Sequence, residues 1–411
     1  MTHAEIITVR ILYIAAISLV IFQVLSVNYA VSFLLMVTII TVYILWMLTL
    51  YKEVTNRDVM LVCLIVLAAW NVFINAQMAG SDLSFSYIRK LLLFSSTLIF
   101  LQTATKLRIE PRLEQMILNA NSLLAVFLLI EYLIQGNQAY LINGIVTQYL
   151  TFHFTNPNLT GMYLSAIAML EICHAMCEEK KQLKLFHFIL AGGLLYLTYE
   201  TQSRNVLFSI IFFFGMLIVN NFQKGSVHRM NPVIALITIL WPAVFVAVYM
   251  FIINRPALTG YFSFLVSTGK NIDSRIRIWT NALLYFQTSP VFGSYYQLSN
   301  GTGMSQLHNT ALDIAASYGI VVFLGVLVFL FKIMTCRNDT GMTKKQFQYI
   351  SAFSACIIMG MGEAALFSGS LSFFALVGLF MMLTGSSGLQ VNSLYKINDN
   401  ESIKNESSIL V

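Results

Sequence analysis

Charged residues are scarce in this chain, and their scarcity excludes most soluble folds. Of the 411 residues, 10% are charged and 58% are hydrophobic, whereas a soluble domain carries about 25% charged residues. Proline is also rare, with six residues, and apolar stretches of about 20 residues recur with short polar gaps between them. Such stretches indicate transmembrane helices, because membrane β-barrels show short alternating segments instead. The sequence therefore predicts an all-α polytopic membrane protein.

We expect about twelve transmembrane helices within an integral membrane domain of residues 1–385. Their predicted centres lie near residues 16, 40, 69, 96, 126, 168, 191, 212, 243, 321, 356 and 378. The first apolar stretch follows Arg10 and is longer than the core of a signal peptide, so we interpret it as a membrane anchor. Residues 386–411 are polar, which predicts a disordered cytoplasmic tail.

Lysine and arginine residues divide unevenly between the two sides of this topology. The poorer side holds seven of them, Arg89, Lys90, Arg204, Arg255, Lys270, Arg275 and Arg277. By the positive-inside rule, the richer side is cytoplasmic. Both termini are therefore predicted on the cytoplasmic side of the plasma membrane, and the large loop of residues 254–308 on its outer side. The net charge of +6 follows from this distribution and gives no reason to expect a nucleic acid partner.

Cysteines and nucleotide-binding motifs add further exclusions. The five cysteines lie in predicted spans or on the inner side, so no disulfide framework is expected. Cys173, His174 and Cys177 have a spacing that is poor for zinc, and we interpret them as ordinary span residues without a metal. The chain has no P-loop and no GxGxxG motif, so chemistry driven by a nucleotide is not expected.

The arginines on the outer side indicate a functional role, because a charge near the membrane is unfavourable and costs about 2.5–3.5 kcal/mol at the centre of a span. Arg204 lies in a short outer turn, YETQSRNVLF, while Arg275 and Arg277 lie in the large loop. Arginine can hold phosphate oxygens through two parallel hydrogen bonds, and it keeps its charge. The alternative for each arginine is an interfacial anchor that reaches lipid phosphate.

Residues 273–287 predict an amphipathic helix along the membrane surface, with Asp273 as its N-cap. The apolar face holds four residues, Ile276, Trp279, Leu283 and Phe286. On a wheel of about 100° per residue, Arg275 lies near Trp279 at the edge of this face, and Arg277 lies well away from it. We therefore favour Arg275 as the functional arginine and assign Arg277 to the solvated face or to lipid headgroups.

His308 ends the large loop, just before the predicted tenth span. Because histidine can titrate near neutral pH, it could accept a proton from a sugar hydroxyl; the alternative is a satisfied polar residue at the interface. Asn309 could bind substrate or cap the next helix. Five carboxylates compete for the role of base, Glu131, Glu200, Asp273, Asp313 and Glu363. Glu363 is the strongest competitor, because its span is otherwise apolar and flanked by glycines, although it could instead pair with a buried arginine.

Four segments, taken in order, resemble the signature of the O-antigen polymerase and ligase superfamily. They are FTNPNLTGMYL (154–164), TQSRN (201–205), SRIRIW followed by SPVFG (274–293), and LHNTALDIAASYGI (307–320). The resemblance covers roughly residues 150–325. It implies a membrane glycosyltransferase of the C type that uses undecaprenyl-pyrophosphate-linked oligosaccharide on the outer face without a metal or another cofactor.

The resemblance also implies roles for single residues. Arg204 matches the arginine after the seventh span, Arg275 the arginine four positions before the loop tryptophan, and His308 the histidine at the end of the loop, so we predict these three as catalytic. The predicted substrate-binding residues are Asn158, Arg277, Trp279, Asn309 and Glu363. Two departures affect local turns: Asn205 stands where glycine is usual, and Ser294 and Tyr295 replace a second glycine after SPVFG.

These roles imply an inverting glycosyl transfer in which arginines stabilise the departing pyrophosphate. The acceptor is another lipid-linked repeat unit in a polymerase that builds O-antigen, capsule or exopolysaccharide, or a lipid A core sugar in a ligase. We favour the polymerase, because HNTALDIAASYGI is closer to polymerase versions and the outer loop is not unusually basic. A flippase or other transporter would place polar residues along a central pathway, whereas here they concentrate on one face. Besides the lipid-linked donor, a chain-length regulator and a flippase are expected partners.

Overall fold

The structure is a computed structural model, and it describes about two thirds of the chain. The described residues are 55–78, 85–106, 109, 111–136, 138–142, 145–150, 152, 156–223, 228–255, 272–294, 307–335, 341–363, 367 and 371–385. The first two predicted spans, much of the loop 254–308 and the predicted tail 386–411 lie outside these residues.

Eleven helices and one β-hairpin make up the described part of the chain. The helices are α3 (Asn56–Met78), α4 (Phe85–Lys106), α5 (Pro111–Gln135), α6 (Pro157–Cys177), α7 (Lys181–Glu200), α8 (Arg204–Phe222), α9 (Pro232–Ile253), α12 (Ile272–Thr288), α14 (Thr310–Thr335), α15 (Lys344–Met359) and α16 (Leu371–Leu383). Strands β1 (Gln138–Ile142) and β2 (Ile145–Tyr149) pair antiparallel. The hairpin corrects the all-α expectation, because its alternating β-branched and aromatic residues favour strands in the gap between two spans.

The helices agree with the predicted spans as far as the structure describes them. Each of the ten predicted centres from residue 69 onward falls within one helix. Six helices are long and apolar enough to cross a membrane, α3, α5, α6, α8, α9 and α14. The chain is therefore a polytopic membrane protein, and the count of twelve spans stays a prediction.

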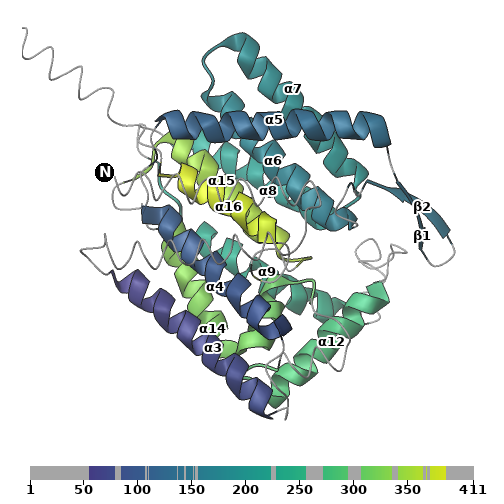
Figure 1. Cartoon of the computed structure of the whole chain (residues 1–411), viewed down its shortest axis with the longest axis vertical. Coiled ribbons are helices and arrows are strands. Elements are labelled where there is room, and N and C mark those ends of the chain that lie inside the picture. Colours follow the sequence, from purple (N-terminus) through teal and green to yellow (C-terminus); the bar gives the residue numbers. More distant parts are fainter. Residues whose placement is uncertain are drawn as a thin grey trace, which may run out of the picture.

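Helices α6 and α15 form the buried centre of the molecule. Sixteen residues of α6 are buried, and α15 is buried from Gln346 to its end. The two helices contact each other, while α15 also packs against α8, α9 and α16. Figure 1 shows α15 and α16 side by side in the middle of the molecule, with α5 and α7 at one end and α3, α12 and α14 at the other.

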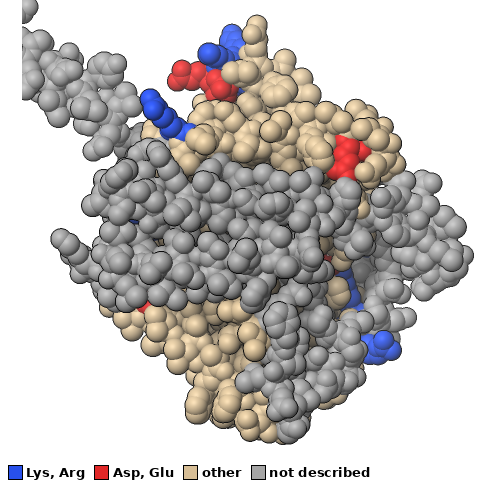
Figure 2. Space-filling model, in the orientation of Figure 1, with Lys and Arg blue, Asp and Glu red and all other residues tan. Residues whose placement is uncertain are grey.

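The outer surface of the bundle is apolar. Large hydrophobic side chains are exposed on α3, α5, α7, α8 and α9, among them Leu133 and Ile211. In Figure 2 most of the described surface is uncharged, and Lys, Arg, Asp and Glu side chains gather at a few places near the edges. Extended apolar surface of this kind marks an interaction site, and contact with lipid accounts for it in a polytopic protein.

Two glycines let the segment after α12 pass close to α14. Gly293 and Gly319 have φ values of 79° and 84°, which favour glycine because it lacks a Cβ. A Cβ at Gly319 would overlap the carbonyl oxygen of Val291, and the non-helical backbone of Gly319 kinks α14. Ser294, where a second glycine was expected, does not have a positive φ and donates its N–H to Ala316 O at 2.6 Å. This position therefore does not require glycine.

Candidate active site

The carboxylate of Glu363 is the centre of a polar cluster. Its Oε1 accepts hydrogen bonds from Asn158 Nδ2 at 2.8 Å and from the Arg275 guanidinium at 3.1 Å. Its Oε2 lies 2.8 Å from His308 Nδ1. The four side chains come from the start of α6, from α12, from the segment before α14 and from the turn after α15. Four residues that the sequence singled out separately thus lie in one cluster.

Close backbone contacts place Glu363. The N–H of Thr310 donates to Gly360 O at 2.8 Å, and a Cβ at Gly360 would lie 2.7 Å from the Thr310 hydroxyl. A Cβ at Gly362 would lie 2.9 Å from the amide of Asn205. The two glycines beside Glu363 thus allow α8 and α14 to approach its turn, as the sequence indicated for close helix packing.

An N-terminal cap positions Asn158. The side chain of Asn156 accepts the Asn158 N–H at 2.9 Å, and Pro157 occupies the first turn of α6. Asparagine at the cap followed by proline is a favoured start of a helix. The cap fixes the first turn of α6, so the Asn158 amide meets Glu363 from a rigid element.

The backbone of His308 adopts an unfavourable conformation between two anchored neighbours. Its φ is 51°, in the left-handed region, and such a conformation costs about 1–3 kcal/mol in a residue other than glycine. The carbonyl of Leu307 accepts the indole N–H of Trp279 at 2.7 Å. Trp279 is itself buried and packs edge to face against Tyr249. These contacts hold the histidine with its ring against Glu363.

Asn309 anchors the other side of His308. It is fully buried, and its amide donates to the carbonyls of Pro242 and Met361, both at 2.9 Å. Its Oδ1 accepts the N–H of Leu312 at 2.9 Å and thereby caps α14. Of the two roles considered for Asn309, capping is therefore present, and the amide is already occupied by the backbone of three segments.

Helix α12 turns its two arginines in different directions. Arg275 reaches Glu363 with its side chain 32% exposed, while Arg277 is exposed. The exposures of the two arginines agree with the helical wheel. The buried face, however, is formed by Ile278, Trp279 and Ala282, so Trp279 is the one buried residue among the four predicted for it, and the other three are half-buried. Helix α12 begins at Ile272, so Asp273 lies within the helix and the prediction that it is the N-cap is wrong. Its side chain lies outside the described residues.

Arg204 is the first residue of α8, and its side chain is exposed. Its neighbour Asn205 packs against Gly362 and accepts a hydrogen bond from Ser203 Oγ at 2.8 Å. The backbone at Arg204 therefore lies beside the turn that carries Glu363. The asparagine at position 205 is accommodated because the facing residue is glycine.

Two of the competing carboxylates, Asp313 and Glu131, have other partners. Asp313 forms a buried ion pair with Lys90 at 3.0 Å, which also gives a structural reason for one cation of the outer group. Glu131 accepts a hydrogen bond from Gln135 at 3.2 Å. Glu363 and His308 were considered as rival bases, but their contact makes them a pair.

The charges around Glu363 favour its ionised form. Burial raises the pKa of Glu363, but the hydrogen bond and charge of His308, the charge of Arg275 and the amide of Asn158 together bring it below its ordinary value. An ionised carboxylate only accepts hydrogen bonds, so His308 Nδ1 is the donor between them. When the ring is neutral with its proton on Nδ1, the other nitrogen, Nε2, has a free lone pair, in a side chain that is 28% exposed. This arrangement suits a histidine base that a carboxylate orients.

Residues 187–327 match a family model described as O-antigen ligase. The matched segment is about a third of the chain, and it contains Arg204, Arg275 and His308 but neither Asn158 nor Glu363. Among curated proteins, none matches the chain significantly. The family match confirms the resemblance to the O-antigen polymerase and ligase superfamily that the sequence motifs indicated.

Proposed function

We propose, on the premise that residues 187–327 form a segment of the O-antigen ligase family, that the chain transfers a glycan from a lipid pyrophosphate to a hydroxyl group. The observation that carries this proposal is the contact of Arg275 and His308 with the same carboxylate, Glu363. An anion-binding group and a proton acceptor thus stand side by side and are both partly exposed. Glycosyl transfer from pyrophosphate requires these two groups together.

The arginines act on the leaving group. When the bond between the anomeric carbon and the pyrophosphate oxygen breaks, the bonding electrons leave with the lipid pyrophosphate, and negative charge grows on its oxygens. A guanidinium has five N–H donors, so the single bond from Arg275 to Glu363 leaves donors for phosphate. Arg204, beside the turn of Glu363, supplies a second cation. Fixed charges of this kind stabilise a transition state in which charge develops.

His308 acts on the acceptor. Its Nε2 takes the proton from the attacking hydroxyl as the new bond to the anomeric carbon forms, and Glu363 stabilises the resulting imidazolium. A single displacement inverts the anomeric centre. The activated donor supplies the energy, and the reaction requires no nucleotide.

The acceptor that we favour is a second lipid-linked repeat unit, so the activity is polymerisation of undecaprenyl-pyrophosphate-linked oligosaccharide on the outer face of the plasma membrane. The support is the form of LHNTALDIAASYGI and the modest charge of the outer loop. Transfer to a lipid A core is the second candidate, favoured by the description of the matching family as a ligase.

Expression of the chain in two bacterial deletion strains tests the proposal. One strain lacks its polymerase, the other lacks its ligase, and both must make the repeat unit that this enzyme uses. Restoration of a ladder of repeat lengths on a glycan gel in the first strain identifies a polymerase, and restored capping of the core in the second identifies a ligase. His308→Ala, expressed at the same level, is the control. If the expressed chain changes the glycan pattern of neither strain, the proposal is contradicted.

A further inference from the structure

A second buried polar cluster lies towards the other end of α6. Glu171 and His174 on α6 and His187 on α7 are each less than a tenth exposed. One ligand atom from each lies within 4.8 Å of the other two. Asn158 of the candidate active site precedes His174 by 16 positions on the same helix, about 24 Å at the rise of an α-helix. The two clusters are therefore separate sites.

Neighbouring side chains orient the carboxylate of Glu171. It accepts hydrogen bonds from Asn121 Nδ2 at 2.6 Å and from Ser122 Oγ at 2.9 Å, both on α5. Its Oε2 lies 2.8 Å from His187 Nδ1. The two hydrogen bonds from α5 resemble the outer set of hydrogen bonds that holds a metal-binding carboxylate, and the contact with His187 brings two candidate ligands together.

His174 has an unused donor or acceptor atom. Its side chain is 3% exposed, and its Nδ1 has no hydrogen-bond partner among the described residues. Its ring lies against that of His187, with ring centroids 3.7 Å apart. Buried polar atoms nearly always have a partner. A missing ligand would supply one here.

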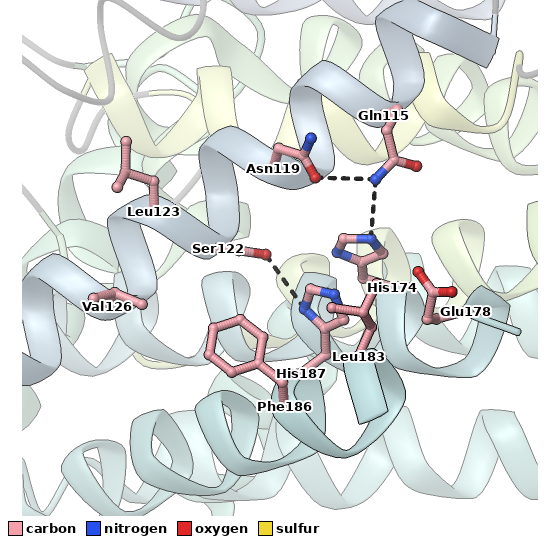
Figure 3. Close-up of a pocket in the computed structure, with 10 residues that line it drawn as sticks. All are labelled: Gln115, Asn119, Ser122, Leu123, Val126, His174, Glu178, Leu183, Phe186 and His187. Atoms are coloured by element: carbon pink, nitrogen blue, oxygen red, sulfur yellow. Dashed lines mark hydrogen bonds between the residues drawn. The ribbon is translucent and has the colours of Figure 1, made fainter. Parts of the chain in front are cut away.

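A cavity of about 360 Å³ opens beside the two histidines. Figure 3 shows the rings of His174 and His187 facing it between α5 and the α6–α7 hairpin. Polar groups of Gln115, Asn119 and Glu178 line the same space. The cavity offers an entry path and room for water as a further ligand.

We propose that Glu171, His174 and His187 bind a divalent transition-metal ion, with Zn²⁺ as the best fit. Two imidazoles and one carboxylate with an open fourth position are a common zinc ligand set. Zinc bonds of about 2.0–2.2 Å bring tetrahedral ligand atoms to roughly 3.5 Å apart. Rotation of the two histidine side chains, which line a cavity, would bring the ligand atoms to this spacing, and the 2.8 Å contact of His187 Nδ1 with Glu171 Oε2 would open to it.

The ion would join α6 and α7. Glu171 and His174 precede the short turn between α6 and α7, and His187 follows it, so one bound ion closes the base of this hairpin. The ligands differ from the Cys173–His174–Cys177 set that the sequence suggested and that we discounted. Cys177 Sγ instead contacts Gln348 on α15, and His187 comes from the next helix.

Titration of the full-length protein with Co²⁺ tests this site. The protein is purified in detergent, treated with a chelator and freed from it. We expect one Co²⁺ per chain, with the visible absorption bands of a site bound by nitrogen and oxygen and without a thiolate band, and displacement of the Co²⁺ by Zn²⁺. His174→Ala and His187→Ala should each weaken binding at least tenfold, because each removes a direct ligand.

Two variants serve as matched controls. His228→Ala removes another buried histidine that lies outside the cluster, and Cys177→Ser removes the thiol three positions after His174 on the same helix; both should keep one Co²⁺ per chain. A monodisperse wild-type protein that binds no stoichiometric Co²⁺ or Zn²⁺ would overturn the proposal, and this result needs no variant. Unchanged binding by folded His187→Ala, or a thiolate band that Cys177→Ser abolishes, would overturn it as well.

Discussion

Arg275 and Arg277 on α12 allow the role of one arginine in the candidate active site to be tested against a neighbouring arginine. Arg275 contacts Glu363, whereas Arg277 is two positions further along α12 and exposed. Both are arginines on one helix, so they form a natural matched pair. A lysine in place of arginine keeps the charge but lacks the planar fork of donors. The pair therefore separates a geometric requirement from a requirement for positive charge.

We expect Arg275→Lys to lose most glycosyl transfer and Arg277→Lys to lose little. Arg204→Lys should resemble Arg275→Lys, because we assign both arginines to the departing pyrophosphate. The measurement is the transfer rate per molecule of purified protein with a lipid-linked donor. If Arg277→Lys were the most damaging of the three at equal protein levels, the assignment of the two α12 arginines would be wrong.

The ionised state of Glu363 predicts how stability depends on pH. Its pKa is held below the ordinary value, mainly by His308 and Arg275 acting against burial. A lowered pKa stabilises the fold above the ordinary value of about 4.3, and the contribution is lost as pH falls through the folded-state pKa. The melting temperature of the wild type should therefore exceed that of Glu363→Gln at pH 7, and the gap should shrink below about pH 4. Glu131→Gln is the control, and a gap that grows in acid would contradict the ionised carboxylate.

The sequence identified the members of this cluster but not their contacts. Arg275 could be preferred over Arg277 because helical periodicity is local. Glu363 and His308 are 55 positions apart in the sequence. Each was a candidate functional residue because it is polar in an apolar stretch, but the sequence did not indicate that the two side chains are in contact. Asn158 was found only through its motif, since an amide at the start of a helix is ordinary. Contacts between distant segments depend on the packing of helices, which a single sequence does not specify.

At the scale of elements, the kink in α14 sets the shape of the loop end. Gly319 lies against the segment that follows α12, and the same helix begins next to His308. Backbone hydrogen bonds join α14 to the segment after α12 in both directions. Ile320 N donates to Pro290 O at 2.8 Å, and Ser294 N donates to Ala316 O at 2.6 Å. A side chain at Gly319 would therefore move α12 relative to α14.

Gly319→Ala should lower the free energy of unfolding by about 2 kcal/mol or more, because it adds a clash to an unfavourable φ. Gly215→Ala is the matched control. Gly215 lies within α8 with open space around its Cα, so alanine there should be neutral or stabilise by about 0.5–1 kcal/mol. Unfolding in detergent measures both. Equal stability of Gly319→Ala and the wild type would show that the kink is not required.

Helices could be predicted where a hydrophobic pattern continues over many residues. Apolar runs located ten of the described helices, and the amphipathic pattern located α12. The hairpin of β1 and β2 was missed because five-residue strands leave no long run and lie in a gap between spans. The kink of α14 was also missed, since glycine is common in membrane helices and its φ depends on what packs against it.

At the scale of the whole molecule, the orientation in the membrane decides where the chemistry takes place. The proposed site joins the start of α6, the loop end before α14 and the turn after α15, which the predicted topology places on the side that is poor in lysine and arginine. The cluster of Glu171, His174 and His187 lies near the start of α7, which the predicted topology places on the side that is rich in them. The account therefore places the two sites on opposite faces of the membrane.

Cysteine labelling tests this orientation. A cysteine at Gln287, exposed on α12, should react with an impermeant maleimide added to intact cells, and one at Gln182, exposed at the start of α7, should react only after the cells are opened. The unsubstituted protein controls for its own cysteines. The reverse pattern would place the candidate site in the cytoplasm and exclude a donor on the outer face.

Turnover of a purified lipid-linked oligosaccharide by wild type, His308→Ala and Glu363→Gln tests the central claim most directly. The account predicts that the wild type forms a product with inverted anomeric configuration. Because a general base contributes about 10²–10⁴ in rate, His308→Ala should lose that factor while it still binds the donor, and Glu363→Gln should lose a comparable factor because it no longer orients the histidine. Near-normal turnover by folded His308→Ala, with or without loss in Glu363→Gln, would contradict the histidine base that this account places at the centre of the reaction.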